Sequence, residues 1–146
     1  WLWGFSTKVL FNLTTKRYQE RDIEKMIQDS NFIINSVQVE DKFGDNGITG
    51  VFIIKKENKI EWRIDTFLMS CRIMGRDIEK GIMTYIINEA RKNNIEKINA
   101  DFFPTQKNKP VENFLSDNEF KRNGQFWTYE IKSKIKLPEY LRMEVK

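Results

Sequence analysis

The stretch that decides the fold is residues 64–79, which read IDTFLMSCRIMGRDIE. Its first half is a strongly apolar run typical of a β-strand, and from Ile78 the apolar residues recur at helical spacing. Gly75 permits a tight turn between the two, so the first N–H groups of the helix should converge on one point that favours an anion. Arg72 and Arg76 flank this glycine, and guanidinium groups suit phosphate oxygens. The stretch predicts a phosphate-binding loop, with a solvated helix entrance as the alternative.

Outward from this loop, the apolar periodicity predicts alternating strands and helices. The expected elements are strands at 11–18, 32–39, 48–54, 60–69, 98–103 and 126–131, a helix within 19–31, a helix from Ile78 to about Asn93, and a short helix around 111–115. This order predicts an α/β (α+β) fold in which helices flank a mixed, largely antiparallel sheet. We expect one domain at 11–135. Residues 1–10 would be a truncated N-terminal segment or an opening strand, and 136–146 a basic C-terminal tail.

The composition excludes several classes of function. The 146 residues carry 25 Lys+Arg and 21 Asp+Glu, a net charge of +4, and they include no histidine. Relays and zinc sites that need an imidazole are therefore excluded, and we expect no metal cofactor. A single cysteine, no apolar run of membrane-spanning length and no secretion signal predict a cytoplasmic protein with no membrane association.

Four strings of the sequence carry a resemblance to a known family. RIMGRD at 72–77 resembles the Arg/Gln-x-x-Gly-x-Gly/Ala loop of the GNAT acyltransferases. Together with FNLTTKRY (11–18), DKFGDNGITGV (41–51) and PTQKNKPVENF (104–114), the segment around it resembles the C-terminal GNAT-like domain of FkbH-like proteins. The likeness covers about residues 11–120, in the same order and with compatible spacing.

The resemblance implies a GNAT-like domain that binds coenzyme A, acyl-CoA or the phosphopantetheine of an acyl carrier protein and assists transfer of a small, glyceryl-type acyl group. Full-length relatives begin with a HAD-type phosphatase domain, which would be a further partner. The implied ligand-binding residues are Arg72, Gly75, Arg76 and Asp77 in the loop, with Lys107 and Asn108 of the later polar loop. Asn108 matches the asparagine that binds the pantetheine arm, with helix capping as its alternative role.

Two residues are candidates for the chemistry. Without histidine, a carboxylate is the expected general base, and Asp65 faces the side where an acceptor would enter. Asp101 on the neighbouring strand is the second candidate. A salt bridge to Arg63 or Arg72 is the alternative for both carboxylates, and we favour it for Asp101. Cys71, near the helix start and beside Arg72, is a candidate acyl carrier, and its alternative is a buried small hydrophobe.

Three positions depart from the family pattern. Asp77 stands where Gly or Ala is usual, and its carboxylate would compete with a phosphate for the helix N-terminus, or simply act as the N-cap. Leu115 stands where a proton-donating tyrosine is common, and Glu119 replaces a glycine before Phe120. The alternative function is therefore a docking module without activity, or a structural partner of a missing phosphatase domain.

Nucleic-acid binding is the competing class, because the isoelectric point is near 9.1. It is disfavoured, since the basic residues are interspersed with acids and no recognition motif is present. Basicity instead suits an acidic carrier protein. Trp62 and Trp127 are expected to be core or interface aromatics.

Overall fold

A computed structural model describes residues 9–12, 18–42, 44–70, 77–102, 113–124, 126–132 and 135–143. Their elements, in chain order, are β1 (Val9–Asn12), α1 (Glu20–Gln28), β2 (Phe32–Asp41), β3 (Gly44–Lys56), β4 (Glu61–Ser70), α2 (Ile78–Lys92), β5 (Lys97–Asp101), α3 (Phe114–Asp117), β6 (Lys121–Asn123) and β7 (Phe126–Glu130).

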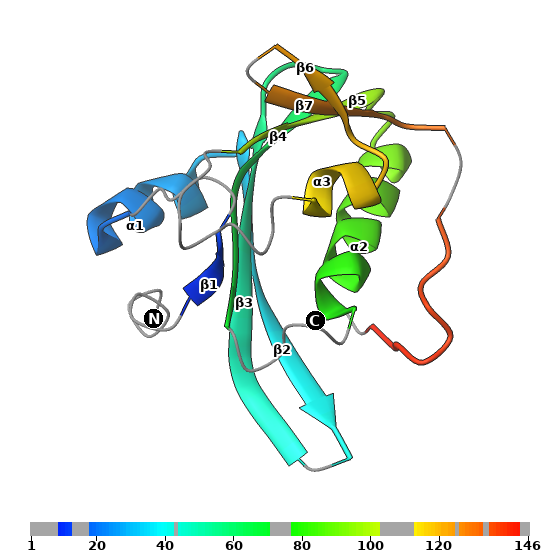
Figure 1. The fold of residues 1–146 in the computed structure, drawn as a ribbon. Helices are drawn as coiled ribbons and strands as arrows, with labels where there is room; N and C mark the ends of the chain where they lie inside the picture. The colour runs from blue at the N-terminus through cyan, green and yellow to red at the C-terminus, as the bar shows by residue number, and fades with distance from the viewer. Residues whose placement is uncertain are drawn as a thin grey trace.

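The strands form one sheet, in the order β2-β3-β4-β5-β7-β6, with β1 paired to β4. The pairings are antiparallel except for β4 with β5, so the predicted mixed, largely antiparallel sheet is confirmed. Helix α1 lies on one face of the sheet, and α2 and α3 lie on the other (Figure 1).

Strand β3 has a core on each of its faces, as its nearly continuous apolar sequence predicts. Val51 and Ile53 pack with Ile23 of α1, while Phe52 and Ile54 belong to the larger core beneath α2. The predicted amphipathic face of α2 is buried in that larger core, where it places Ile82, Met83, Ile86, Ile87 and Ala90. Burial of these two faces fixes the sheet between its helices.

Strand β4 contains a bulge that the sequence analysis missed. Ile64 pairs with Ile54 but Thr66 pairs with Ile53, so Asp65 is one extra residue in β4. A bulge of this kind puts two consecutive side chains on one face and reverses the alternation beyond it. Trp62 and Ile64 accordingly face the α2 core before the bulge, and Phe67 and Met69 face it afterwards.

The neighbour of β4 changes at the same place. β5 pairs with β4 as far as Ile64, opposite Ala100, and β1 pairs with it from Leu68 to Ser70. Since β3 occupies the other edge throughout, β5 and β1 lie one after the other along one edge of β4. The bulge therefore lies between two different strand partners.

Several predicted boundaries differ from the structure, and one strand was not predicted. The strand predicted at 98–103 ends at Asp101, before the Pro104 that was expected to stop it. The first strand begins at Val9, two residues early. β6, at 121–123, was not predicted because its three side chains are all exposed and carry no apolar alternation.

The C-terminal segment, residues 135–143, lies along α2. The Asn88 side-chain amide donates to the Ile135 carbonyl (2.8 Å), and the Ile135 N–H donates to the Asn88 side-chain oxygen (3.0 Å). Further on, Leu141 and Leu137 approach Gly81 so closely that a Cβ there would meet Leu141 Cδ1 at 3.1 Å. The absence of a side chain at Gly81 thus lets this segment pack against the helix.

Candidate functional site

The bulge in β4 places a carboxylate in a buried polar cluster. Asp65 is only 6% exposed, and its Oδ2 accepts hydrogen bonds from the Tyr18 hydroxyl (2.5 Å) and the Thr66 hydroxyl (3.0 Å). A buried charge is costly unless hydrogen bonds compensate it, and two hydroxyl donors supply that compensation here. Asp65 thus lies between the part of β4 that pairs with β5 and the part that pairs with β1.

Tyr18 owes its position to the start of α1. The Asp22 carboxylate accepts a hydrogen bond from the Gln19 N–H (3.0 Å), which fixes the first turn of the helix directly after Tyr18. Burial, the hydrogen bond to Asp65 and the negative charge of Asp65 all raise the pKa of the Tyr18 phenol well above its usual value. The phenol therefore stays protonated and continues to donate to the carboxylate.

Asp101 is in an ion pair, as predicted. Its Oδ1 lies 2.6 Å from a terminal guanidinium nitrogen of Arg63, and that guanidinium also pairs with Glu57. The Arg63 guanidinium carbon lies 5.3 Å from the centroid of the Phe126 ring, a cation–π arrangement. Of the two candidate bases, Asp101 is thus committed to a cation, whereas Asp65 is held by hydroxyl groups.

Asp77 occupies the N-cap position of α2 but makes no side-chain cap hydrogen bond. Its backbone has a left-handed φ of 59°, and its carbonyl accepts from the Gly81 N–H (3.0 Å). The carboxylate instead accepts a hydrogen bond from the Tyr140 hydroxyl of the C-terminal segment. Asp77 is therefore at the N-cap position, as predicted. Its carboxylate does not compete with a ligand for the helix N–H groups, because it is hydrogen-bonded to Tyr140.

A second acid lies in the first turn of α2. Burial, and to a smaller extent the charge of Asp77, raise the pKa of the Glu79 carboxyl. Its Oε2 is buried and makes no hydrogen bond within the described parts of the chain. The start of α2 therefore carries two carboxyl groups, one bound to a tyrosine and one that burial biases toward its protonated form.

The remaining departures from the family pattern have plain structural correlates. Leu115 is 1% exposed and packs in the core beneath α2, where it has no proton to donate. Glu119 has a φ of 66°, the left-handed conformation that favours glycine. Asp77 and Glu119 thus adopt glycine-like conformations at two positions where the family pattern has, or permits, glycine.

Trp62, 3% exposed, is a core aromatic as predicted, and Trp127 is partly buried against the same core.

Six predicted site residues lie outside the described residues. They are Cys71, Arg72, Gly75, Arg76, Lys107 and Asn108. The described residues on either side of the first loop are the end of β4 and the start of α2, so it connects a strand to a helix as predicted.

The sequence analysis did not identify the two tyrosines that donate hydrogen bonds to Asp65 and Asp77. Tyr18 is 47 residues from Asp65 in the sequence, and Tyr140 is 63 residues from Asp77, so no local spacing of residues predicts these contacts. The bulge did leave a local signal, because the apolar residues shift from even to odd positions between Ile64 and Phe67. That shift places the acid and hydroxyl of Asp65 and Thr66 on the same face.

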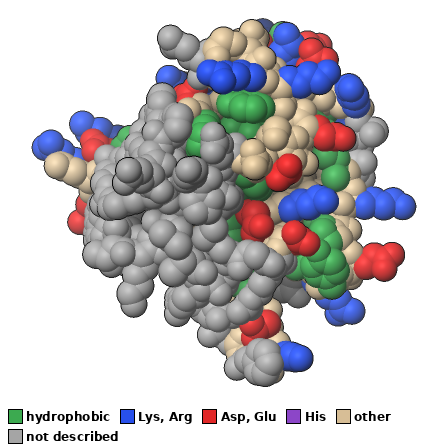
Figure 2. Space-filling model, in the orientation of Figure 1, with side chains coloured by type: hydrophobic (Ala, Val, Ile, Leu, Met, Phe, Trp, Pro, Cys, Tyr) green, Lys and Arg blue, Asp and Glu red, His purple; other side chains and the backbone are tan. Residues whose placement is uncertain are grey.

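The arrangement provides a proton acceptor, without a metal-binding group in the parts of the chain that are described. On the face shown in Figure 2, basic and acidic side chains are interspersed among the described residues, which agrees with the charge pattern of the sequence. No helix among the described residues is long and apolar enough to cross a membrane.

No family model matches the sequence, and no curated protein sequence matches it significantly. Solved structures do match the fold. The ribosomal-protein-S18-alanine N-acetyltransferase of Escherichia coli superposes with a TM-score of 0.67 at 8% identity, covering 97% of this chain and 91% of that one. An aminoglycoside 6'-N-acetyltransferase complexed with coenzyme A gives 0.62 at 11% identity, covering 82% and 84%. A GNAT-family acetyltransferase from Staphylococcus aureus Mu50 gives 0.59 at 15% identity, covering 77% and 75%. The chain therefore has the GNAT fold.

Proposed function

We propose that this chain is an acyltransferase domain that binds coenzyme A or a carrier-bound phosphopantetheine and uses Asp65 as its general base. The observation that carries the proposal is the bulge in β4. It holds a buried carboxylate beside two hydroxyl groups, between two different strand partners and close in sequence to the arginine-glycine loop. In a chain without histidine, a positioned carboxylate is the group best suited to take a proton from an acceptor.

The proposed reaction is direct acyl transfer. The nucleophilic atom of an amine, hydroxyl or thiol acceptor forms a bond to the thioester carbonyl carbon, and its proton passes to the Asp65 carboxylate. The carbon–sulfur bond then breaks, the pantetheine thiolate leaves and is protonated from solvent, and Asp65 releases the proton that it accepted to solvent, so that no net proton is gained or lost. Tyr18 and Thr66 hold the carboxylate oxygen in place throughout. Cys71 would carry the acyl group only if transfer proceeds in two steps.

The start of α2 is the proposed site for the ligand phosphates. A helix N-terminus favours an anion, and the carboxylate of Asp77 does not cap it. Arg72 and Arg76, which precede α2 in the sequence, are proposed to supply the guanidinium groups. Lys107 and Asn108 are proposed to contact the phosphate and the pantetheine arm.

The narrower proposal is a domain of the FkbH-like type that handles a glyceryl-type acyl group on an acyl carrier protein, in the cytoplasm and beside a HAD-type phosphatase domain. Its support is the four ordered strings of sequence. The left-handed backbones of Asp77 and Glu119 support the broader GNAT-like part of the proposal, because they occupy positions where the GNAT pattern has, or permits, glycine. The net charge of +4 suits an acidic carrier.

Calorimetric titration with coenzyme A tests the binding proposal. We expect the Arg72→Ala, Arg76→Ala double variant to lose about 1.5–3 kcal/mol per charged hydrogen bond removed. The matched control is the Arg91→Ala, Arg122→Ala double variant, which removes the same charge from exposed positions on α2 and β6. Equal losses in both pairs would mean that net charge, not the loop, attracts the ligand. No heat of binding to the unmodified protein would refute the proposal.

A docking module without activity is the second candidate, favoured by one observation. Leu115 is fully buried and apolar at the position where a proton donor is common. If coenzyme A or holo-carrier protein binds but no acyl thioester is turned over by the unmodified protein or by Leu115→Tyr, this second candidate is correct.

A further inference from the structure

The two outer strands of the sheet differ in how they are protected from pairing with other chains. β6, at one end, has three residues, of which Lys121 and Arg122 are exposed cations. Short length and positive charge are common protections of a sheet edge. β2, at the other end, has ten residues, FIINSVQVED, without lysine, arginine or proline. Among the described residues β2 pairs only with β3, and it lacks these protections.

The pairing pattern shows which backbone groups of β2 point outward. The Lys56 N–H donates to the Asn31 carbonyl (2.7 Å), and antiparallel residues alternate between inward and outward hydrogen bonding. With Ile33 opposite Ile54 and Asn35 opposite Phe52, these odd-numbered residues bond toward β3. The N–H and C=O groups of Ile34 and Ser36 therefore point away from the sheet.

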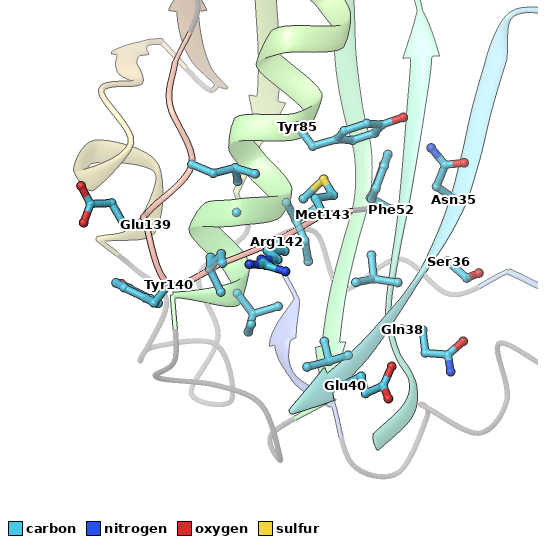
Figure 3. A pocket seen from close by; sticks show the side chains of 17 residues that line it. Asn35, Ser36, Gln38, Glu40, Phe52, Tyr85, Glu139, Tyr140, Arg142 and Met143 are labelled. Carbon is cyan, nitrogen blue, oxygen red and sulfur yellow. The ribbon is translucent and has the colours of Figure 1, made fainter. Parts of the chain in front are cut away.

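A groove of about 470 Å³ runs along this edge. All six residues at 35–40 line it, and because consecutive residues point to opposite faces, the edge itself borders the groove. The opposite wall is the C-terminal segment, and Figure 3 shows Arg142 and Met143 between α2 and the strands. Tyr85 and Phe52 lie at one end, with ring centroids 6.1 Å apart.

We propose that the β2 edge joins a second copy of this chain, antiparallel about a two-fold axis near Ser36, into one continuous sheet. A two-fold contact requires a strand to be complementary to itself. The acids of β2 are confined to its last two positions, Glu40 and Asp41. With Ser36 opposite Ser36 of the second copy, Glu40 lies opposite Phe32, so no two carboxylates face each other. A parallel pairing would align the acids and is disfavoured.

The surroundings of β2 suit a protein partner on both faces. Helix α1 packs against this part of the sheet through Ile23 and Met26, yet the neighbouring Ile27 is 62% exposed. On the other face, the groove beside Ser36 gives room for the side chains of an added strand. The interface would thus combine backbone hydrogen bonds at the edge with apolar contacts from α1.

Analytical ultracentrifugation over a dilution series tests the proposal with two variants. Ser36→Pro removes an outward N–H, a change that an edge strand tolerates. Ser36→Lys puts two like charges opposite each other at the axis. We expect the unmodified chain to dimerise reversibly and each variant to raise the dissociation constant by at least about tenfold. The matched control is Ser116→Lys, which adds the same charge at an exposed serine of α3 and should leave the constant unchanged.

Circular dichroism of each variant shows that its fold is intact, and Ser36→Lys serves as the test if Ser36→Pro is unfolded. An unmodified chain that stays monomeric at its highest soluble concentration overturns the proposal. So does a dimer whose dissociation constant is the same in folded Ser36→Lys or Ser36→Pro as in Ser116→Lys, because the copies would then meet elsewhere.

Discussion

Two tyrosine–aspartate pairs join distant parts of this chain, and they differ in burial. In one pair the Tyr18 hydroxyl donates to Asp65, which is 6% exposed inside the sheet layer. In the other the Tyr140 hydroxyl donates to Asp77 at the entrance of α2, and Tyr140 is 68% exposed. The same two functional groups, a phenol and a carboxylate, thus form a buried hydrogen bond at Asp65 and a solvent-exposed one at Asp77.

The two pairs should respond differently to the loss of a hydroxyl group, because water can reach one carboxylate and not the other. A buried carboxylate has few alternative partners, so each lost donor leaves charge without compensation. At an exposed site, water replaces the lost hydroxyl and the net contribution is small. The contrast predicts large effects from changes at Asp65 and Tyr18, and small effects from the same changes at Asp77 and Tyr140.

The largest expected effect is on turnover. Asp65→Asn keeps the shape of the side chain but removes its ability to accept a proton as a base, and we expect acyl transfer to fall by about 10²–10⁴-fold. Asp77→Asn should change the rate by less than about threefold, because that carboxylate lies at the helix entrance. Thiol release from an acyl-CoA in the presence of an acceptor measures both. Equal losses would show that the two carboxylates are not chemically distinct.

The second effect is on stability. Tyr18→Phe removes one of the two hydroxyl donors to the buried Asp65 and should lower the free energy of unfolding by about 1–3 kcal/mol. Tyr140→Phe is the matched control, and its unfolding midpoint in urea should not differ from that of the unmodified chain. A Tyr18→Phe protein as stable as the control would show that the buried and the exposed tyrosine contribute equally to stability.

The third effect appears at alkaline pH. The folded chain holds the Tyr18 proton more tightly than the unfolded chain, since the phenol pKa is raised. The stabilisation is therefore complete below the ordinary tyrosine pKa of about 10 and is lost as the pH rises above it. Urea midpoints measured across that range should fall more steeply for the unmodified chain than for Tyr18→Phe. Parallel curves would mean that this proton is bound equally in both states.

The smallest effect concerns ligand affinity at the exposed pair. Asp77→Gly removes a carboxylate beside the helix N-terminus, an electrostatic change of about 0.3–1 kcal/mol, and glycine accepts the left-handed φ of 59°. We expect coenzyme A to bind a few-fold more tightly by calorimetry. Weaker binding would instead assign the Asp77 carboxylate a direct role in holding the ligand.

The sequence predicts the parts of this molecule that follow from local periodicity. The buried face of α2 and the doubly covered β3 are both encoded by the spacing of apolar residues within each element. β6 was not predicted, because its three exposed polar residues show no apolar periodicity. Its existence depends on pairing with β7, which is a tertiary effect.

The candidate site is predictable only in part for the same reason. The absence of histidine makes Asp65 a candidate base, and the structure shows Arg63 as the partner of Asp101, where the sequence left Arg63 and Arg72 open. The tyrosines that hold the two aspartates are not identifiable, because each comes from a segment far away in sequence. Residue type thus indicates the chemistry, while tertiary packing decides which carboxylate is buried.

The extra residue in β4 adds a carboxylate to the strand without moving its apolar side chains out of their layers. If Asp65 were deleted, Thr66 would follow Ile64 directly and the strand would become regular, with Thr66 still opposite Ile53 and Phe67 still opposite Phe52. Phe67 and Met69 would therefore stay in the α2 core. Deletion of Asp65 is therefore expected to remove the buried carboxylate while leaving the two layers that cover β4 intact.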